Sequence, residues 1–101
     1  MNTSPISDTT IKQCLDFIVQ DSTLLADLRS DHAGETGAVW IYKGILSGSG
    51  DPEVREFASK HLEAESRHLA LMEALLTQSQ RSSLLPLWRL AGFLTGYVPS
   101  L

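Results

Sequence analysis

The chain has 101 residues, of which 43% are hydrophobic and 20% charged, and its formal net charge is −4. This length allows one small domain, and the acidic balance gives a nucleic-acid partner no support, so we expect none. A single cysteine, Cys14, excludes an internal disulfide and fits a reducing compartment. Because no basic segment followed by an apolar run is found at the start, we expect no secretory signal and predict a cytoplasmic protein.

The first 20 residues are predicted to form a leader and a short helix. Residues 1–10 are rich in serine and threonine and show no periodicity, which predicts a flexible leader. From Ile11 to Gln20, apolar residues recur at helical spacing. A short amphipathic helix is therefore expected there, with Cys14 as a small core residue.

Two long helices joined by a short turn are predicted next. The first begins near Ser22, whose hydroxyl can cap it, and runs to about Leu46, where a Ser-Gly-Ser-Gly segment breaks the pattern. Asp51 then caps the second helix, and Pro52 occupies its first turn, where a missing amide donor costs nothing. This helix continues to roughly Gln80. The two helices predict an antiparallel hairpin in an all-α fold with short flanking helices.

The apolar face of each long helix is interrupted by a carboxylate. At about 100° per residue, Glu35 lies within the apolar stripe of the first helix, and Glu65 within that of the second. His68, three residues after Glu65, projects to the same side. An uncompensated carboxylate in an apolar interior costs several kcal/mol unless a cation or strong donors balance it. We therefore predict that Glu35, Glu65 and His68 bind a metal.

This ligand set is half of a known arrangement. Ferritin-like four-helix proteins that bind two metals use a Glu from each of two helices and Glu-x-x-His from each of the other two. Residues 11–82 carry one Glu helix and one Glu-x-x-His helix, and thus half of a di-metal site. Two copies would balance the charge of two divalent cations. We predict a ferritin-like half-bundle completed by homodimerisation, with the metals at the interface.

Several polar and apolar residues are expected around these ligands. Asp31 and His32 are predicted to hydrogen-bond to the ligands, because metal-bound imidazoles need an acceptor for their other nitrogen. His61 shares the inward face, either in the same role or as a hydrogen-bonded histidine of the core or its rim. Tyr42 and Met72 are candidate substrate-pocket residues, with core packing as the alternative for each.

The opposite side of the first long helix carries a run of small residues, which suits the close approach of a neighbouring helix: Ala26, Ser30, Ala33, Gly37 and Gly44. Residues 83–101 form an apolar tail with Arg89 as its only charge. Its prolines and Arg89 leave too little apolar length for a bilayer-spanning helix, which needs about 20 residues. Trp88 and Tyr97 suit a membrane interface. A helix at the membrane surface and a helix capping the dimer core are both consistent with this composition.

Four segments carry a resemblance to a known family: DHAGETGA at 31–38, IYKG at 41–44, ESRH at 65–68 and LPLWRLAGF at 85–93. Across roughly Leu28 to Leu94, the chain resembles the demethoxyubiquinone hydroxylases. These are ferritin-like di-iron monooxygenases that hydroxylate the ring of a prenylated quinone intermediate in ubiquinone biosynthesis, using dioxygen.

The resemblance implies that Glu35, Glu65 and His68 are iron ligands, with Glu65 bridging and two irons per dimer. The donor set is also compatible with Mn(II), so the choice of iron comes from the resemblance. A lipophilic quinone substrate favours peripheral attachment of the tail to the inner face of a membrane.

In one respect the chain departs from this family. The family continues into a second half with another Glu helix and another Glu-x-x-His helix, whereas this sequence stops at Leu101. A hairpin with one apolar face has no cover of its own, which favours pairing of two chains. Two alternatives remain: an iron-oxidising or iron-storage protein of ferritin-like type, and a non-catalytic half-length partner of a full-length hydroxylase.

Overall fold

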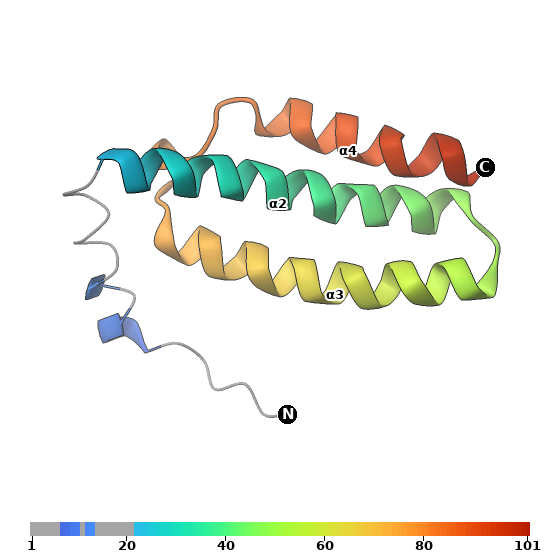
Figure 1. Ribbon diagram of the computed structural model, residues 1–101, viewed down its shortest axis with the longest axis horizontal. Helices are drawn as coiled ribbons and strands as arrows, with labels where there is room; N and C mark the ends of the chain where they lie inside the picture. The colour runs from blue at the N-terminus through green and yellow to red at the C-terminus, as the bar shows by residue number, and fades with distance from the viewer. Residues whose placement is uncertain (1–6, 11, 14–21) are drawn as a thin grey trace.

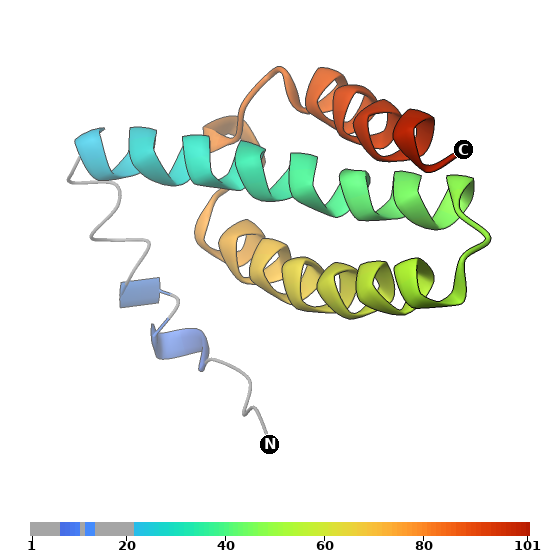
Figure 2. The same cartoon turned by 45° about the vertical axis from the view of Figure 1, so that its right-hand side comes forward.

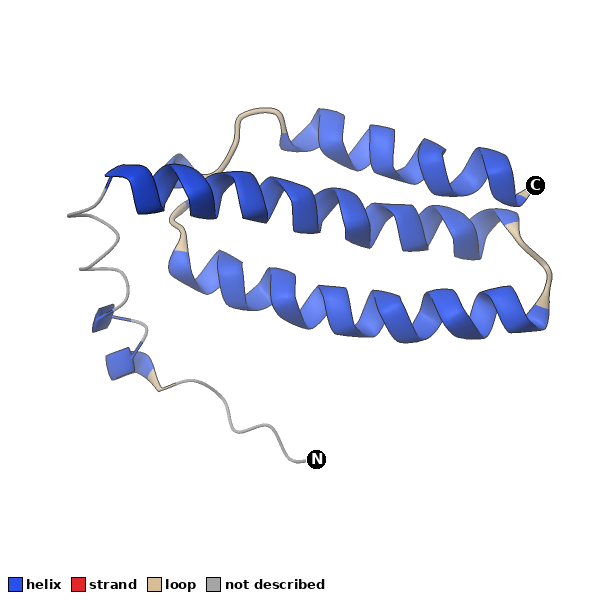
Figure 3. Ribbon diagram, viewed as in Figure 1, coloured by secondary structure: helices blue, strands red, loops and turns tan. Residues whose placement is uncertain are grey.

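A computed structural model describes residues 7–10, 12–13 and 22–101. Within these residues the regular structure is entirely helical, which confirms the all-α prediction (Figure 3). Its main elements are α2 (Ser22–Gly48), α3 (Pro52–Leu75), the 3-10 helix η1 (Gln78–Gln80) and α4 (Leu85–Ser100). Apart from residues 12–13, the helix predicted over 11–20 lies outside the described residues, as do Cys14 and residues 1–6 of the predicted leader.

Helices α2 and α3 form the predicted antiparallel hairpin (Figure 1). Helix α2 begins at Ser22 and continues to Gly48, slightly beyond its predicted end. Asp51 caps α3 as predicted: its Oδ1 accepts hydrogen bonds from the backbone N–H of Glu53 at 2.9 Å and of Val54 at 3.5 Å. Pro52 is the first residue of α3. The start of α3 is therefore specified locally, by the side-chain cap of Asp51 and by Pro52, whose missing backbone N–H is not needed in the first turn.

The second long helix is shorter than predicted. It ends at Leu75, and Leu76 takes an extended conformation with φ −116° and ψ 126°, so the predicted end near Gln80 is wrong. Two interactions replace the helical pattern there. The side chain of Gln80 accepts a hydrogen bond from the backbone N–H of Thr77 at 2.8 Å, and Arg81 donates to carbonyls of the last turn. These bonds satisfy the groups that a continued helix would have paired.

Helix α4 packs against the small-residue side of α2 and runs alongside it, opposite α3 (Figures 1 and 2). A methyl group at Gly44 would collide with the backbone carbonyl of Phe93, and one at Gly96 with that of Ile41. The two backbones approach this closely because these positions lack a Cβ atom. The neighbour expected on this side of α2 is thus α4.

The three helices lie side by side. Helix α2 lies in the middle and packs against α3 on one side and α4 on the other (Figure 2). Ala58 is the one residue of α3 that is fully buried. Such a layer leaves apolar faces uncovered, and stable domains are built from at least two packed layers.

The apolar tail is helical, and its outer side is exposed. The exposed large apolar residues of α4 are Leu87, Trp88, Leu90, Leu94 and Val98. Among residues 22–101, none of the helices combines the length and the hydropathy that crossing a bilayer requires.

Candidate metal centre

The three predicted ligands come together between α2 and α3. Glu35 projects from α2, whereas Glu65 and His68 project from α3 one helical turn apart. One donor atom from each of the three lies within 4.8 Å of the others. The Nδ1 atom of His68 is 3.8 Å from Oε2 of Glu65. This separation follows from the three-residue spacing, which places both side chains on one helical face.

The cluster is closed on one side and open on the other. The side chain of Glu65 is 24% exposed and that of His68 is 63% exposed. In contrast, Oε2 of Glu35 is buried and has no hydrogen-bond partner. The chain thus supplies three donors on the inner side and leaves the outer side free for further ligands.

The charges at the cluster do not balance without a bound proton or cation. The pKa of Glu35 is raised from its ordinary value near 4.5 to about 7. The largest cause is a hydrogen bond with the side chain of Glu65, followed by burial, by the charge of Glu65 and by that of Asp31. The nearby imidazole of His68 acts in the opposite direction. A cation between the two carboxylates would take over the role of the proton.

The residues fit a divalent transition metal. Two carboxylates and one imidazole are donors that suit iron and manganese, and the unpaired buried oxygen of Glu35 lacks the partner that an ion would supply. Three protein donors leave coordination positions open, which a reactive site requires.

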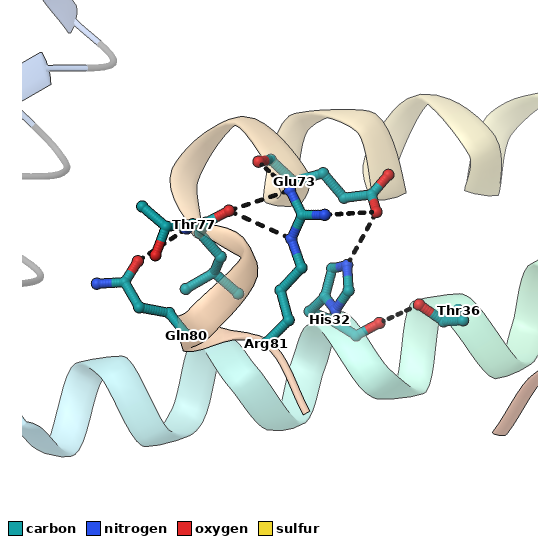
Figure 4. Close-up of polar contacts among 7 residues, drawn as sticks. His32, Thr36, Glu73, Thr77, Gln80 and Arg81 are labelled. Carbon is teal, nitrogen blue, oxygen red and sulfur yellow. Dashed lines mark hydrogen bonds and ion pairs between the residues drawn. The ribbon is translucent and has the colours of Figure 1, made fainter. Parts of the chain in front are cut away.

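The predicted neighbours of the ligands differ in burial and in the residues that they contact. Asp31 is exposed on α2, near enough to contribute to the raised pKa of Glu35. His32 is completely buried, and its Nε2 atom lies 3.3 Å from Oε2 of Glu73, as Figure 4 shows. His61 stacks on the ring of Tyr42, with centroids 5.4 Å apart, and contacts Phe57. The contacts found for His32 and His61 are therefore with neighbours outside the ligand cluster.

Tyr42 and Met72 both lie on the hairpin. Tyr42 belongs to the aromatic group with His61, and Met72 is half-buried on α3. An open groove of about 230 Å³ lies instead between α2 and α4, lined in part by Gly34, Ala38 and Trp88. Neither Tyr42 nor Met72 lines this groove. Their assignment to a substrate pocket stays a prediction.

Sequence reasoning missed Glu73 and Arg81, which contact each other at the open end of the hairpin. The Nη1 atom of Arg81 lies 3.5 Å from Oε2 of Glu73. Glu73 lies four residues after Leu69 and three before Leu76, and this place in the apolar stripe of the helix could have identified it. No periodic signal points to Arg81, because it lies beyond the end of α3.

Comparison with known proteins gives a consistent result. The family model described as ubiquinone biosynthesis protein COQ7 matches residues 22–101. The NADPH-dependent 3-demethoxyubiquinone 3-hydroxylase of Dictyostelium discoideum is 39% identical over 80 residues, covering 73% of this chain and 35% of the relative. The 3-demethoxyubiquinol 3-hydroxylase of Rhodospirillum rubrum is 42% identical over 72 residues, which cover 68% of this chain and 34% of the relative. The human NADPH-dependent 3-demethoxyubiquinone 3-hydroxylase is 35% identical over 71 residues, which cover 68% of this chain and 33% of the relative.

The chain spans about a third of the length of these curated relatives. No solved structure shows a significant match. The family match nevertheless covers α2, α3, η1 and α4 completely, together with the three residues that converge. The chain belongs to the COQ7 family of ubiquinone biosynthesis proteins.

Proposed function

We propose that this chain is half of a di-iron hydroxylase and that two copies assemble the complete site. The observation that carries the proposal is the convergence of Glu35, Glu65 and His68 within 4.8 Å. Relatives in the family are named as hydroxylases of demethoxyubiquinol or demethoxyubiquinone. The proposed substrate is accordingly a lipophilic quinol, hydroxylated on its ring.

The proposed assembly is a homodimer in which the open sides of the two clusters face each other. A layer of helices with large apolar residues exposed needs a second layer to bury them, and a second copy would also supply three further ligands. Two-fold symmetry gives both metals the same donors. Four carboxylates then offset the charge of two divalent cations. Iron is the metal proposed, with two ions per dimer, and Mn(II) is compatible with the same donors.

The chemistry divides between the metal and the chain. Bound iron would supply the redox chemistry that activates dioxygen. In the net reaction one oxygen atom enters a ring C–H bond, and the other leaves as water, consuming two protons and two electrons. NADPH, which the names of several relatives contain, is the proposed electron source.

The chain's own residues hold and shield the site in this proposal. Glu35 and Glu65 would hold the metals through ionised carboxylates, and His68 would do so through a ring nitrogen. Asp31, at the exposed edge, would accept a hydrogen bond from a bound imidazole. Tyr42 and Met72 would keep the quinol ring in an apolar setting that excludes water.

Two further histidines and the terminal segments complete the proposal. His32 and His61 would act on the site through the residues they contact. Residues 1–10 would be a leader, 11–82 the functional hairpin, and 83–101 the segment that rests on a membrane surface or caps the dimer. Of these last two roles, the exposed apolar side of α4 and a lipid-soluble substrate favour the membrane.

Metal analysis combined with solution mass tests the proposal. The chain, produced in iron-rich medium, is expected to hold two irons per dimer and to lose them on Glu65→Ala or His68→Ala. Glu63→Ala is the matched control, because Glu63 lies on the same helix but pairs with Arg67 on the exposed side. A monomer without metal would contradict the proposal.

Activity separates this function from its alternatives. The reduced protein is expected to consume dioxygen while converting a demethoxyubiquinol to its hydroxylated product. Dioxygen consumption that accompanies only Fe(II) oxidation would identify an iron-oxidising protein. Binding of a full-length hydroxylase without either reaction would identify a non-catalytic partner.

A further inference from the structure

Two sets of side-chain contacts between α2 and α3 lie on either side of the three converging ligands. Toward the hairpin turn, the rings of Tyr42, Phe57 and His61 pack together. Toward the open end, His32 of α2 meets Glu73 of α3, and Glu73 in turn pairs with Arg81, which follows η1 (Figure 4). We call this second set the polar clamp.

The polar clamp begins at a fully buried imidazole. Nε2 of His32 lies 3.3 Å from Oε2 of Glu73, and the same oxygen lies 3.5 Å from Nη1 of Arg81. Because a carboxylate beside a guanidinium is an acceptor, Nε2 is the nitrogen that donates. A carboxylate that accepts from the ring in this way fixes its orientation.

Arg81 is itself held in place by the end of α3. Its Nη2 donates to the backbone carbonyls of Glu73 at 2.9 Å and Leu76 at 3.1 Å, and its Nε donates to Leu76 at 3.3 Å. The preceding residue is tied to α2, because Nε of Arg29 donates to the carbonyl of Gln80 at 2.7 Å. One guanidinium thus closes the last turn of α3 and holds the Glu73 carboxylate toward α2.

The register of the clamp links it to the ligands. His32 precedes Glu35 by three residues, and Glu73 follows His68 by five, so the clamp lies about one turn from Glu35 on α2 and about one and a half turns from His68 on α3. We propose that His32, Glu73 and Arg81 are positioning residues that set the separation of α2 and α3 at which Glu35, Glu65 and His68 can share one metal ion. This inference rests on the proposed metal site and names the residues that support its geometry.

Metal affinity tests the clamp through Glu73→Gln, which keeps the shape of the side chain but removes its charge. Co(II) is titrated into the full chain, and binding is followed by the visible absorption of the bound ion. Affinity is expected to fall by about 10-fold, the lower end of the loss on removing a direct partner of a ligand, because Glu73 acts through the helix separation. Arg81→Gln is expected to act in the same direction.

Glu63→Gln is the matched control. The substitution is chemically identical and on the same helix, but Glu63 pairs with Arg67 at 3.1 Å on the exposed side. The Co(II) affinity of the Glu63→Gln variant is expected to stay within about twofold of that of the unchanged chain. All titrations are made at a temperature at which circular dichroism shows each variant fully helical, so that loss of folding is not mistaken for loss of positioning.

A second measurement reads the helix separation without any metal. Spin labels are placed at the exposed positions Asp27 on α2 and Ala70 on α3, in a Cys14→Ser background diluted with unlabelled chain. Glu73→Gln is expected to shift or broaden the distance distribution, and Glu63→Gln to leave it unchanged.

The outcomes separate the two proposals. If the unchanged chain binds no Co(II), the proposed metal function fails, and the label distances alone decide whether the clamp sets the helix separation. If the unchanged chain binds Co(II) and Glu73→Gln binds it equally well, the metal site stands and the clamp inference is overturned.

Discussion

Helix α2 has two neighbours, and it contacts them in opposite ways. Toward α4 its glycines bring backbone against backbone, and Trp40 packs edge-on against Phe93 with ring centroids 6.5 Å apart. Toward α3 it presents a glutamate with an unpaired buried oxygen and a buried histidine with an unpaired Nδ1. The α2–α4 interface is closely packed, whereas the α2–α3 interface contains buried polar atoms without a hydrogen-bond partner. We infer that the contact with α4 mainly stabilises α2, and that the contact with α3 mainly positions the proposed metal ligands.

The largest effect is expected at the α2–α4 interface. Gly96→Ala places a methyl group against the backbone carbonyl of Ile41, which cannot move without shifting the helix. We expect a loss of about 3 kcal/mol in the free energy of unfolding, measured by urea denaturation. Gly34→Ala is the control, since nothing lies within 4 Å of the added methyl group and the helix gains about 1 kcal/mol of propensity. Equal losses in both variants would remove the contrast between the interfaces.

Metal should stabilise the other interface by a comparable amount. At about 100 times its dissociation constant, a divalent ion that binds only the folded state adds about 2.7 kcal/mol. Because the three converging residues come from α2 and α3, hydrogen exchange should slow more in α3 than in α4. Uniform slowing along the chain, or none at all, would contradict this assignment. Removal of the ion with a chelator should restore the original rates.

A smaller effect should follow pH in the metal-free protein. Folding raises the pKa of Glu35 from about 4.5 to about 7, so the folded state holds a proton that the unfolded chain releases. Stability from this group is therefore full below about pH 4.5 and is lost as pH rises through 7. After allowance for solvent screening we expect a decrease of about 1 kcal/mol between pH 5 and 8, measured by urea denaturation. Glu35→Gln should abolish this part of the pH dependence, and an unchanged slope would show that another group is responsible.

The smallest effect is expected on the exposed side of α3. Lys60 and Glu56 form an ion pair at 3.2 Å, and both side chains are more than two-thirds exposed. Lys60→Ala should lower stability by less than about 0.5 kcal/mol and leave Co(II) affinity unchanged. A change in Co(II) affinity would mean that the exposed side of α3 also takes part in binding the metal.

The hairpin and its three converging residues could be predicted because the determinants are local. Asp51 and Pro52 mark the start of α3, and the helical period alone brings Glu65 and His68 to one face. The end of α3 could not be predicted in the same way. It depends on Arg81, whose side chain bonds to carbonyls of the last turn from beyond the helix.

The sequence by itself determined that the protein is helical, where the hairpin turns and which carboxylates face inward, because periodicity and capping act over a few residues. Only the tertiary structure decided that α4 fills the small-residue side of α2, and that His32 is held by Glu73 and Arg81. These contacts join residues up to 55 positions apart, as for Ile41 and Gly96. They depend on shape and on backbone carbonyls, which periodicity does not encode.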